Sequence, residues 1–177
     1  SGTAETLIEL VRPIDLLLPA AVLNRLPFLA RARVLEEAHL VLIQAEAFRE
    51  AIATDHALCL AVLGCQAAQF RRQIKLAKNL KLRSAAERVG CYLLGLVLEA
   101  HPKAPVRLPM EKRLIAWQLA MTRETFSRIL ATMEQYGLRI VGDMVEVADI
   151  APLRARFRLD PQIDGPEPIV PFPPRQR

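Results

Sequence analysis

The chain has 177 residues, of which 52% are apolar and 24% charged, as in an ordinary folded domain. Its net charge of +5 permits an anionic partner such as DNA, whereas an aromatic content of 5% argues against a protein that stacks single-stranded bases. The cysteines are odd in number and form no C-x-x-C pair, which indicates a reducing compartment. Because no signal peptide and no apolar run of transmembrane length is apparent, we expect a cytoplasmic protein without membrane contact.

Residues 1–53 predict a small β-rich unit. Short apolar runs of strand length alternate there with prolines and paired glutamates, at residues 6–11, 14–18, 32–35 and 39–43. Residues 45–53 then have a helical pattern. Because these strands are too few to close a barrel alone, we expect only part of one.

Residues 54–83 predict one long helix that begins at a Thr54-Asp55 cap. Apolar residues recur along it at alternating three- and four-residue spacings, as in a coiled coil: Leu60, Leu63, Ala67, Phe70, Ile74 and Ala77. We call these six residues the seam. A helix buried within its own domain could show the same pattern, but the seam outlasts any obvious cover from this chain and favours a parallel homodimer.

Residues 84–158 predict a winged helix-turn-helix. Ser84 caps a helix over residues 85–100, and a strand-like stretch leads into two short helices at residues 110–119 and 123–136. Two apolar runs around a Gly-Asp turn, at residues 138–141 and 144–147, predict a hairpin. The last stretch, residues 159–177, is rich in proline and is expected to be an extended, poorly ordered tail.

The second short helix of the pair has two unlike faces. Phe126, Ile129, Leu130 and Met133 form one apolar stripe, and a polar edge that includes Arg128 points the other way. Such a helix suits reading of the DNA major groove. On periodicity alone it could equally be an ordinary solvated helix face.

Three strings in the chain are similar to one family. They are KLRSAAERVGCYLL (residues 81–94), EKRLIAWQLAMTRETFSRIL (residues 111–130) and VEVADIAPLRARF (residues 145–157). Together with the order of the elements, they resemble the Crp/Fnr family of bacterial transcription regulators. The resemblance implies an α+β fold with a partial β-roll sensor of the cyclic-nucleotide-binding type, a long dimerisation helix and a C-terminal winged helix-turn-helix. The similarity to the family begins inside the sensor barrel, so we expect the first part of that barrel to be absent from this chain.

The resemblance also implies the DNA contacts. The positions that read bases in the family are here Arg123, Glu124, Ser127 and Arg128. Arginine can pair with guanine O6 and N7, and glutamate can accept from the cytosine amino group. Candidate phosphate contacts are Thr122, Thr125, Gln118 and Arg139. A symmetric dimer would read an inverted repeat with TGA-containing half-sites about one DNA turn apart, and the family suggests RNA polymerase as a further partner.

The family's turn usually has glycine where this chain has Ala120, so we expect mild backbone strain there. In the sensor, the family's phosphate-binding positions fall on Leu17, Leu18, Phe28 and Leu29. All four are apolar, so a cyclic nucleotide is not expected, because nothing would compensate its charge.

The remaining signals leave the sensor's ligand open. An apolar pocket could take haem, with His39 as a conceivable iron ligand, or it could be a filled core. Cys59 and Cys65 could sense oxidants, although buried inert thiols are more common. An alternative function is therefore a haem- or redox-responsive sensor whose winged helix contacts proteins. His39, His56 and His101 are scattered, and no catalytic or metal-binding spacing indicates an enzyme.

Overall fold

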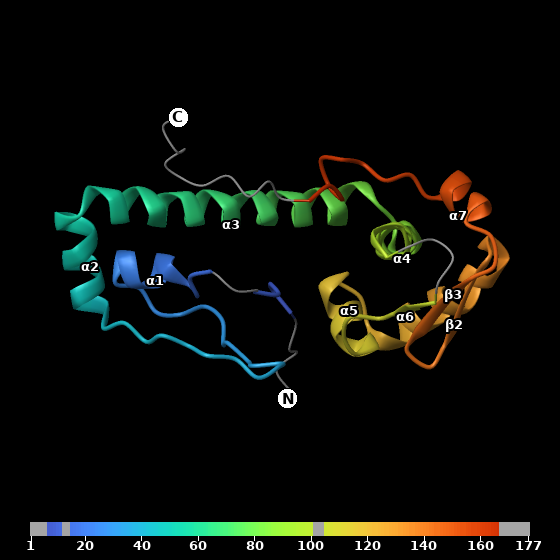
Figure 1. The fold of residues 1–177 in the computed structure, drawn as a ribbon, viewed down its shortest axis with the longest axis horizontal. Coiled ribbons are helices and arrows are strands. Elements are labelled where there is room, and N and C mark those ends of the chain that lie inside the picture. The colour runs from blue at the N-terminus through green and yellow to red at the C-terminus, as the bar shows by residue number, and fades with distance from the viewer. Residues whose placement is uncertain (1–6, 12–14, 101–104, 167–177) are drawn as a thin grey trace. The chain divides into compact units, whose positions relative to one another are not determined.

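The computed structural model describes residues 7–11, 15–100 and 105–166, and the chain forms two compact units (Figure 1). One unit spans residues 11–72, and the other joins residues 73–166 to the described part of residues 1–10. The boundary falls within a single long helix, α3 (His56–Leu82). Residues 167–177, which hold most of the predicted proline tail, lie outside the described residues, as does His101.

The described part of the first unit contains helices joined by irregular segments, the longest of which spans residues 26–44. Its helices are α1 (Pro19–Asn24), α2 (Ala45–Thr54) and the first part of α3. The strands predicted at residues 6–11, 14–18, 32–35 and 39–43 are not formed in the part of them that the structure describes. The physical reason is that a strand is stable only when neighbours pair its N–H and C=O groups, and these short runs find none.

Polar contacts hold the helices of the first unit. Arg49 on α2 donates to the carbonyl oxygen of Val22 on α1 at 2.7 Å, and Arg25 pairs with Glu46 at 3.0 Å. Farther along, the side-chain Nε2 of Gln69 on α3 donates to the carboxylate of Asp15 at 2.9 Å. These contacts place the segment before α2 against two helices without any sheet.

The helix α3 confirms the predicted long helix, and its seam is largely uncovered within the chain. Asp55 accepts from the amide of Leu58 at 3.0 Å, which caps the first turn as expected. Leu63, Phe70 and Ile74 are 56%, 67% and 45% exposed, whereas Val62 on another face is 6% exposed. Of the other seam residues, Ala67 and Ala77 are exposed and Leu60 is half-buried.

No single helix among the described residues is long and apolar enough to cross a membrane. Taken together, α2 and α3 are long and apolar enough for one span, but the chain bends by 113° between them.

The second unit begins with α4 (Ala85–Glu99), which starts at the predicted cap. The hydroxyl of Ser84 accepts from the amide of Glu87 at 3.3 Å, and the Glu87 carboxylate accepts from the amide of Ser84 at 2.8 Å. This reciprocal pair lowers the pKa of Glu87, because hydrogen bonds from Ser84 favour its charged form. The cap thus fixes where α4 begins, with two residues between it and the end of α3. We call residues 83–84, between the two helices, the α3–α4 joint.

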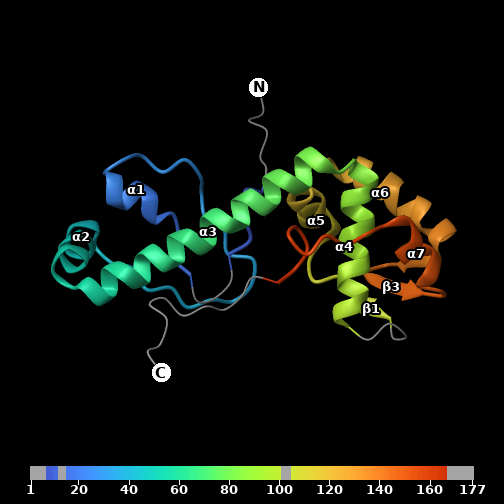
Figure 2. The same ribbon diagram turned by 90° about the horizontal axis from the view of Figure 1, so that it is seen from above.

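A three-stranded antiparallel sheet and four further helical elements complete the unit (Figure 2). The elements in chain order are β1 (Val106–Arg107), α5 (Lys112–Gln118), α6 (Arg123–Thr132), the 3₁₀ turn η1 (Met133–Tyr136), β2 (Leu138–Val141), β3 (Met144–Val147) and α7 (Ala151–Arg156). The sheet order is β1-β3-β2, with Val145 of β3 opposite both Val106 and Ile140. The predicted winged helix-turn-helix is therefore confirmed, hairpin boundaries included.

One apolar core joins these elements. Each element places at least one side chain in it with little or no exposure, including Leu93 of α4, Ile115 of α5, Phe126 of α6, Val145 of β3 and Leu153 of α7. The helix pair therefore sits on a rigid support, because every element that positions it shares the same buried contacts.

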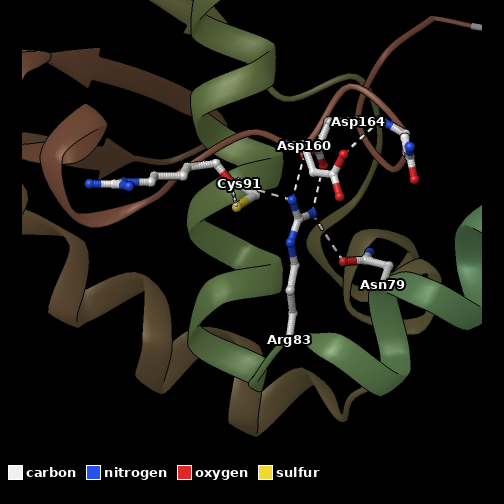
Figure 3. A network of polar contacts seen from close by, with 7 residues as sticks. Asn79, Arg83, Cys91, Asp160 and Asp164 are labelled. Carbon is white, nitrogen blue, oxygen red and sulfur yellow. Dashed lines mark hydrogen bonds and ion pairs between the residues drawn. The ribbon is translucent and has the colours of Figure 1, made fainter.

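Residues 159–166 make defined contacts with α3 and the residue after it, contrary to the expectation of a loose tail from residue 159. Asp164 accepts two hydrogen bonds from the guanidinium of Arg83, at 2.7 and 2.5 Å (Figure 3). The two side chains are only 9% and 20% exposed. Lys75 donates to the carbonyl oxygen of Gly165 at 2.8 Å, and Lys78 to the side chain of Gln162 at 2.6 Å. These contacts fasten residues 158–166 to the end of α3.

Candidate DNA-binding surface

The turn between α5 and α6 has the geometry of a Schellman motif. The amide of Ala120 donates to the carbonyl of Trp117 at 2.9 Å, and the amide of Met121 to that of Ala116 at 3.0 Å. Ala120 has a φ of 51°, in the left-handed region that favours glycine. The strain expected at Ala120 is thus present, in a short turn whose two amides are both hydrogen-bonded to α5 carbonyls.

The helix α6 begins at Arg123, as predicted, and Thr122 is its N-cap. The Thr122 hydroxyl accepts from the amide of Thr125 at 3.2 Å. Phe126 and Leu130 are 0% and 8% exposed and anchor one side of α6 in the core. The buried stripe fixes which side of the helix faces outward.

The four predicted base readers all lie on that outward side. Arg123, Glu124, Ser127 and Arg128 are exposed, and they follow one another within little more than one helical turn. Hydrogen bonds from its own backbone amide and from Thr122 lower the pKa of Glu124, which keeps the carboxylate charged and able to accept from a base amino group. The edge therefore combines two cations, one anion and one hydroxyl.

Thr122 and Thr125 have local partners in this structure. Their hydroxyls lie 3.2 Å apart, and Arg128 donates to the Thr125 hydroxyl at 3.4 Å, a long and weak hydrogen bond. Thr122 is exposed and Thr125 half-buried. Both belong to the first turn of α6, where backbone amides and the helix dipole favour a phosphate.

The other two candidate phosphate contacts differ from each other. Arg139 on β2 is exposed and lies 3.6 Å from a carboxylate oxygen of Glu134. The side-chain oxygen of Gln118 at the end of α5 is buried without a hydrogen-bond partner. Arg139 thus offers a charged group on the wing, whereas the Gln118 oxygen is turned inward.

The residues at the family's cyclic-nucleotide positions belong to the first unit. Leu17, Leu18, Phe28 and Leu29 are 45%, 39%, 62% and 99% exposed. Of these, Phe28 lines a shallow groove between α1 and α2, together with Arg25, Glu46 and Arg49. His39 is exposed, and no group of three or more metal-ligating side chains occurs among the described residues.

The three cysteines are free thiols in different settings. Cys59 and Cys65 on α3 are half-buried, and Cys91 on α4 is 3% exposed. Burial raises the pKa of the Cys91 thiol to about 11, and its Sγ donates to the carbonyl oxygen of Arg158 at 3.5 Å. Such a thiol is protonated at neutral pH and is a poor nucleophile.

Part of the second unit is similar to a known protein family. Residues 87–156 match the family described as the Crp-like helix-turn-helix domain. These residues form a Crp-like helix-turn-helix domain. The members of this family are DNA-binding transcription regulators, and the match covers α4 through α7, the helix pair and its wing included.

Solved structures of regulators are similar to the chain. FixK2 from Bradyrhizobium japonicum is 22% identical, with a TM-score of 0.50 over 67% of this chain and 61% of FixK2, and it shares the fold. A putative cAMP-binding regulatory protein from Silicibacter pomeroyi DSS-3 is 27% identical, with a TM-score of 0.45 over 65% and 50%. A CooA mutant from Carboxydothermus hydrogenoformans is 19% identical, with a TM-score of 0.49 over 63% and 54%. The chain thus spans 61% of FixK2 and about half of the other two, and no curated protein is significantly similar to it in sequence.

Two arginine contacts of the second unit were not indicated by the sequence. The guanidinium of Arg88 contacts the carbonyls of the α5–α6 turn, and Arg83 contacts Asp164. In both cases the partners are more than thirty residues apart in the chain, so no local pattern could have indicated them.

Proposed function

We propose that this chain acts as a sequence-specific regulator of the Crp/Fnr type that reads a palindrome with TGA-containing half-sites. The observation that carries the proposal is the edge formed by Arg123, Glu124, Ser127 and Arg128, exposed on a helix whose opposite side is buried. An arginine fork and a carboxylate held in fixed positions can each recognise one base edge in the major groove. The first-turn hydroxyls of Thr122 and Thr125 and the wing cation Arg139 would contact phosphates.

Selection from a random duplex library with the full chain tests this reading. We expect enrichment of an inverted repeat whose half-site centres lie about 10 base pairs apart. Enrichment of no duplex would contradict the proposal and favour the alternative, in which the winged helix contacts proteins. Binding to RNA polymerase is a separate expectation that follows from the family resemblance.

The dimer that reads both half-sites would form through the seam of α3. Leu63, Phe70 and Ile74 of the seam are exposed in the single chain. Covering such side chains with a second apolar surface lowers the free energy, which favours association. The three- and four-residue spacing suits a parallel two-helix contact. Leu60, Leu63, Ala67, Phe70, Ile74 and Ala77 would thus meet their counterparts in a second copy.

Sedimentation of two variants tests the dimer. Phe70→Glu would bring like charges together at the centre of the seam and is expected to yield monomers. Ala61→Glu adds the same charge at an exposed position of α3 outside the seam and is expected to leave the dimer intact. An intact dimer for Phe70→Glu would show that another surface pairs.

We do not expect a cyclic nucleotide to control this protein. Leu17, Leu18, Phe28 and Leu29 supply no charge to offset a phosphate, and they are partly or fully exposed. Titration calorimetry of the full chain with cyclic AMP is expected to show no binding. An absorbance spectrum of the purified chain would reveal haem, which would favour a haem-responsive sensor.

A further inference from the structure

One guanidinium connects the α3–α4 joint to the turn of the helix pair. Arg88 on α4 donates from Nε to the carbonyl oxygen of Leu119 at 2.8 Å and from Nη2 to that of Ala120 at 3.4 Å. Its Nη1 donates to the carbonyl oxygen of Arg83 at 3.0 Å, just after α3 ends. Three carbonyls from two separate segments therefore share one side chain.

The turn has a specific need for such a donor. In a Schellman motif the amides of the turn are satisfied from within α5, but the carbonyls of Leu119 and Ala120 lie at the negative end of the helix dipole. A cation at this end of the helix lowers the electrostatic energy, and the planar guanidinium group of arginine can donate to two neighbouring carbonyls at once. Burial lowers the pKa of Arg88, so the charge is held at a desolvation cost that these acceptors offset.

The turn also contains a residue in an unfavourable backbone conformation. Ala120 adopts a φ of 51°. This left-handed conformation costs free energy for alanine because of its Cβ atom, but not for glycine. Two residues later, Thr122 is the N-cap of α6 and so sets the direction of the outward edge. Any shift of the peptide at Ala120 would therefore be passed directly to Arg123 and the residues beyond it.

We propose that Arg88 is a positioning residue for DNA reading. Through its 2.8 Å hydrogen bond to the Leu119 carbonyl and its longer one to that of Ala120, it holds the turn in its left-handed conformation and thereby fixes the angle at which α6 presents its edge. Because the same guanidinium is bound to the carbonyl of Arg83, the geometry of the turn is tied to the joint that ends α3. The inference rests on the proposed function in one respect, namely that α6 reads DNA.

The variants are chosen to separate positioning from general stability. Arg88→Gln removes the charge and the fork, and Arg88→Lys keeps the charge but cannot reach three carbonyls in one plane. Ala120→Gly removes the free-energy cost of the left-handed conformation at this position. It should therefore compensate in part for the loss of the Arg88 hydrogen bonds. The full chain carries each change alone and in combination.

Hydrogen exchange in the free protein gives the first readout. In Arg88→Gln we expect the amides of Ala120 and Met121 to exchange about tenfold faster or more, while the amide of Leu93 in the core of α4 keeps its protection. Arg88→Lys should fall between this variant and the wild type. Ala120→Gly should slow exchange at Met121 more in the Arg88→Gln background than in the wild type.

DNA selectivity gives the second readout. Arg88→Gln should lower the ratio of palindrome to unrelated-duplex affinity by about tenfold, with unrelated-duplex affinity unchanged. Wild-type exchange at Ala120 and Met121 in Arg88→Gln, or strictly additive effects with Ala120→Gly, would overturn the inference. A wild type that fails to discriminate between duplexes would instead contradict the proposed function, and the exchange data would still decide the role of Arg88.

Discussion

Gly90 of α4 lies directly against the ring of Phe157, so close that a Cβ atom at Gly90 would be 2.4 Å from the ring carbon Cδ1. Phe157 is 2% exposed, and its ring makes an edge contact with Tyr136 at a centroid distance of 5.2 Å. The close approach lets the chain after α7 pack onto α4. A glycine in the middle of a helix is thus explained by its neighbour rather than by its backbone.

This contact predicts opposite effects for the two glycines of α4. Gly90→Ala should destabilise the unit by about 1–3 kcal/mol, because the methyl group must displace a packed ring. Gly95→Ala, in the same helix with no atom within 4 Å of its Cβ position, should stabilise it by up to about 1 kcal/mol. Urea denaturation of both variants measures the difference. A Gly90→Ala variant as stable as Gly95→Ala would mean that Phe157 does not pack there.

The bond between Arg83 and Asp164 predicts a stabilising role for the segment after α7. Asp164→Asn should cost about 1–3 kcal/mol, since it leaves a mostly buried guanidinium without its carboxylate. The control is Asp143→Asn, which breaks the Arg107–Asp143 pair, whose side chains are 78% and 53% exposed. That change should have little effect on unfolding, as for most exposed pairs. Equal losses in the two variants would contradict the importance of burial.

The cap of α6 predicts a measurable contribution from one hydroxyl. Thr122→Ala should lower the free energy of unfolding by about 1 kcal/mol, because the amide of Thr125 loses its acceptor. Thr122→Ser keeps the acceptor and should remain close to the wild type. Thermal unfolding of the two variants makes the comparison. If Thr122→Ser lost as much as Thr122→Ala, the methyl group rather than the hydroxyl would be responsible.

The buried thiol predicts a pH dependence. Burial raises the pKa of Cys91 from 9.0 to about 11, so the folded protein holds this proton more tightly than the unfolded chain. The resulting stabilisation is complete below pH 9 and is lost as the pH rises toward 11. Under native conditions at about pH 8, iodoacetamide should modify Cys59 and Cys65, both half-buried, before Cys91. Site-resolved mass spectrometry would show whether Cys91 reacts first, which would contradict its burial.

The features that the sequence predicted well depend on neighbours a few residues away. The cap at Ser84 and the start of α6 at Arg123 both depend on local hydrogen-bond patterns. The hairpin follows from a Gly-Asp turn between alternating runs, and its strands have the predicted bounds. The outward edge of α6 followed from the stripe that Phe126 and Leu130 bury.

The features that the sequence predicted poorly depend on distant partners. The runs before α2 have strand composition, but strands require pairing partners, and composition does not supply them. Residues 159–166 were expected to be loose because of their prolines, yet Arg83, Lys75 and Lys78 bind them across long chain separations. The contact of Arg88 with Leu119 is of the same kind. The roles of the outward edge and of the seam stay predictions until they are measured.

The affinity of the full chain for its selected palindrome, compared with duplexes changed at each half-site base, tests the central claim most directly. Arg128→Ala should lose about 1–3 kcal/mol on the palindrome and should tolerate every base at one symmetric position. Arg154→Ala removes an exposed arginine of α7, outside the helix pair, and should keep the wild-type preference. An Arg128→Ala variant with unchanged affinity and unchanged base preference would contradict the account that the edge of α6 reads DNA.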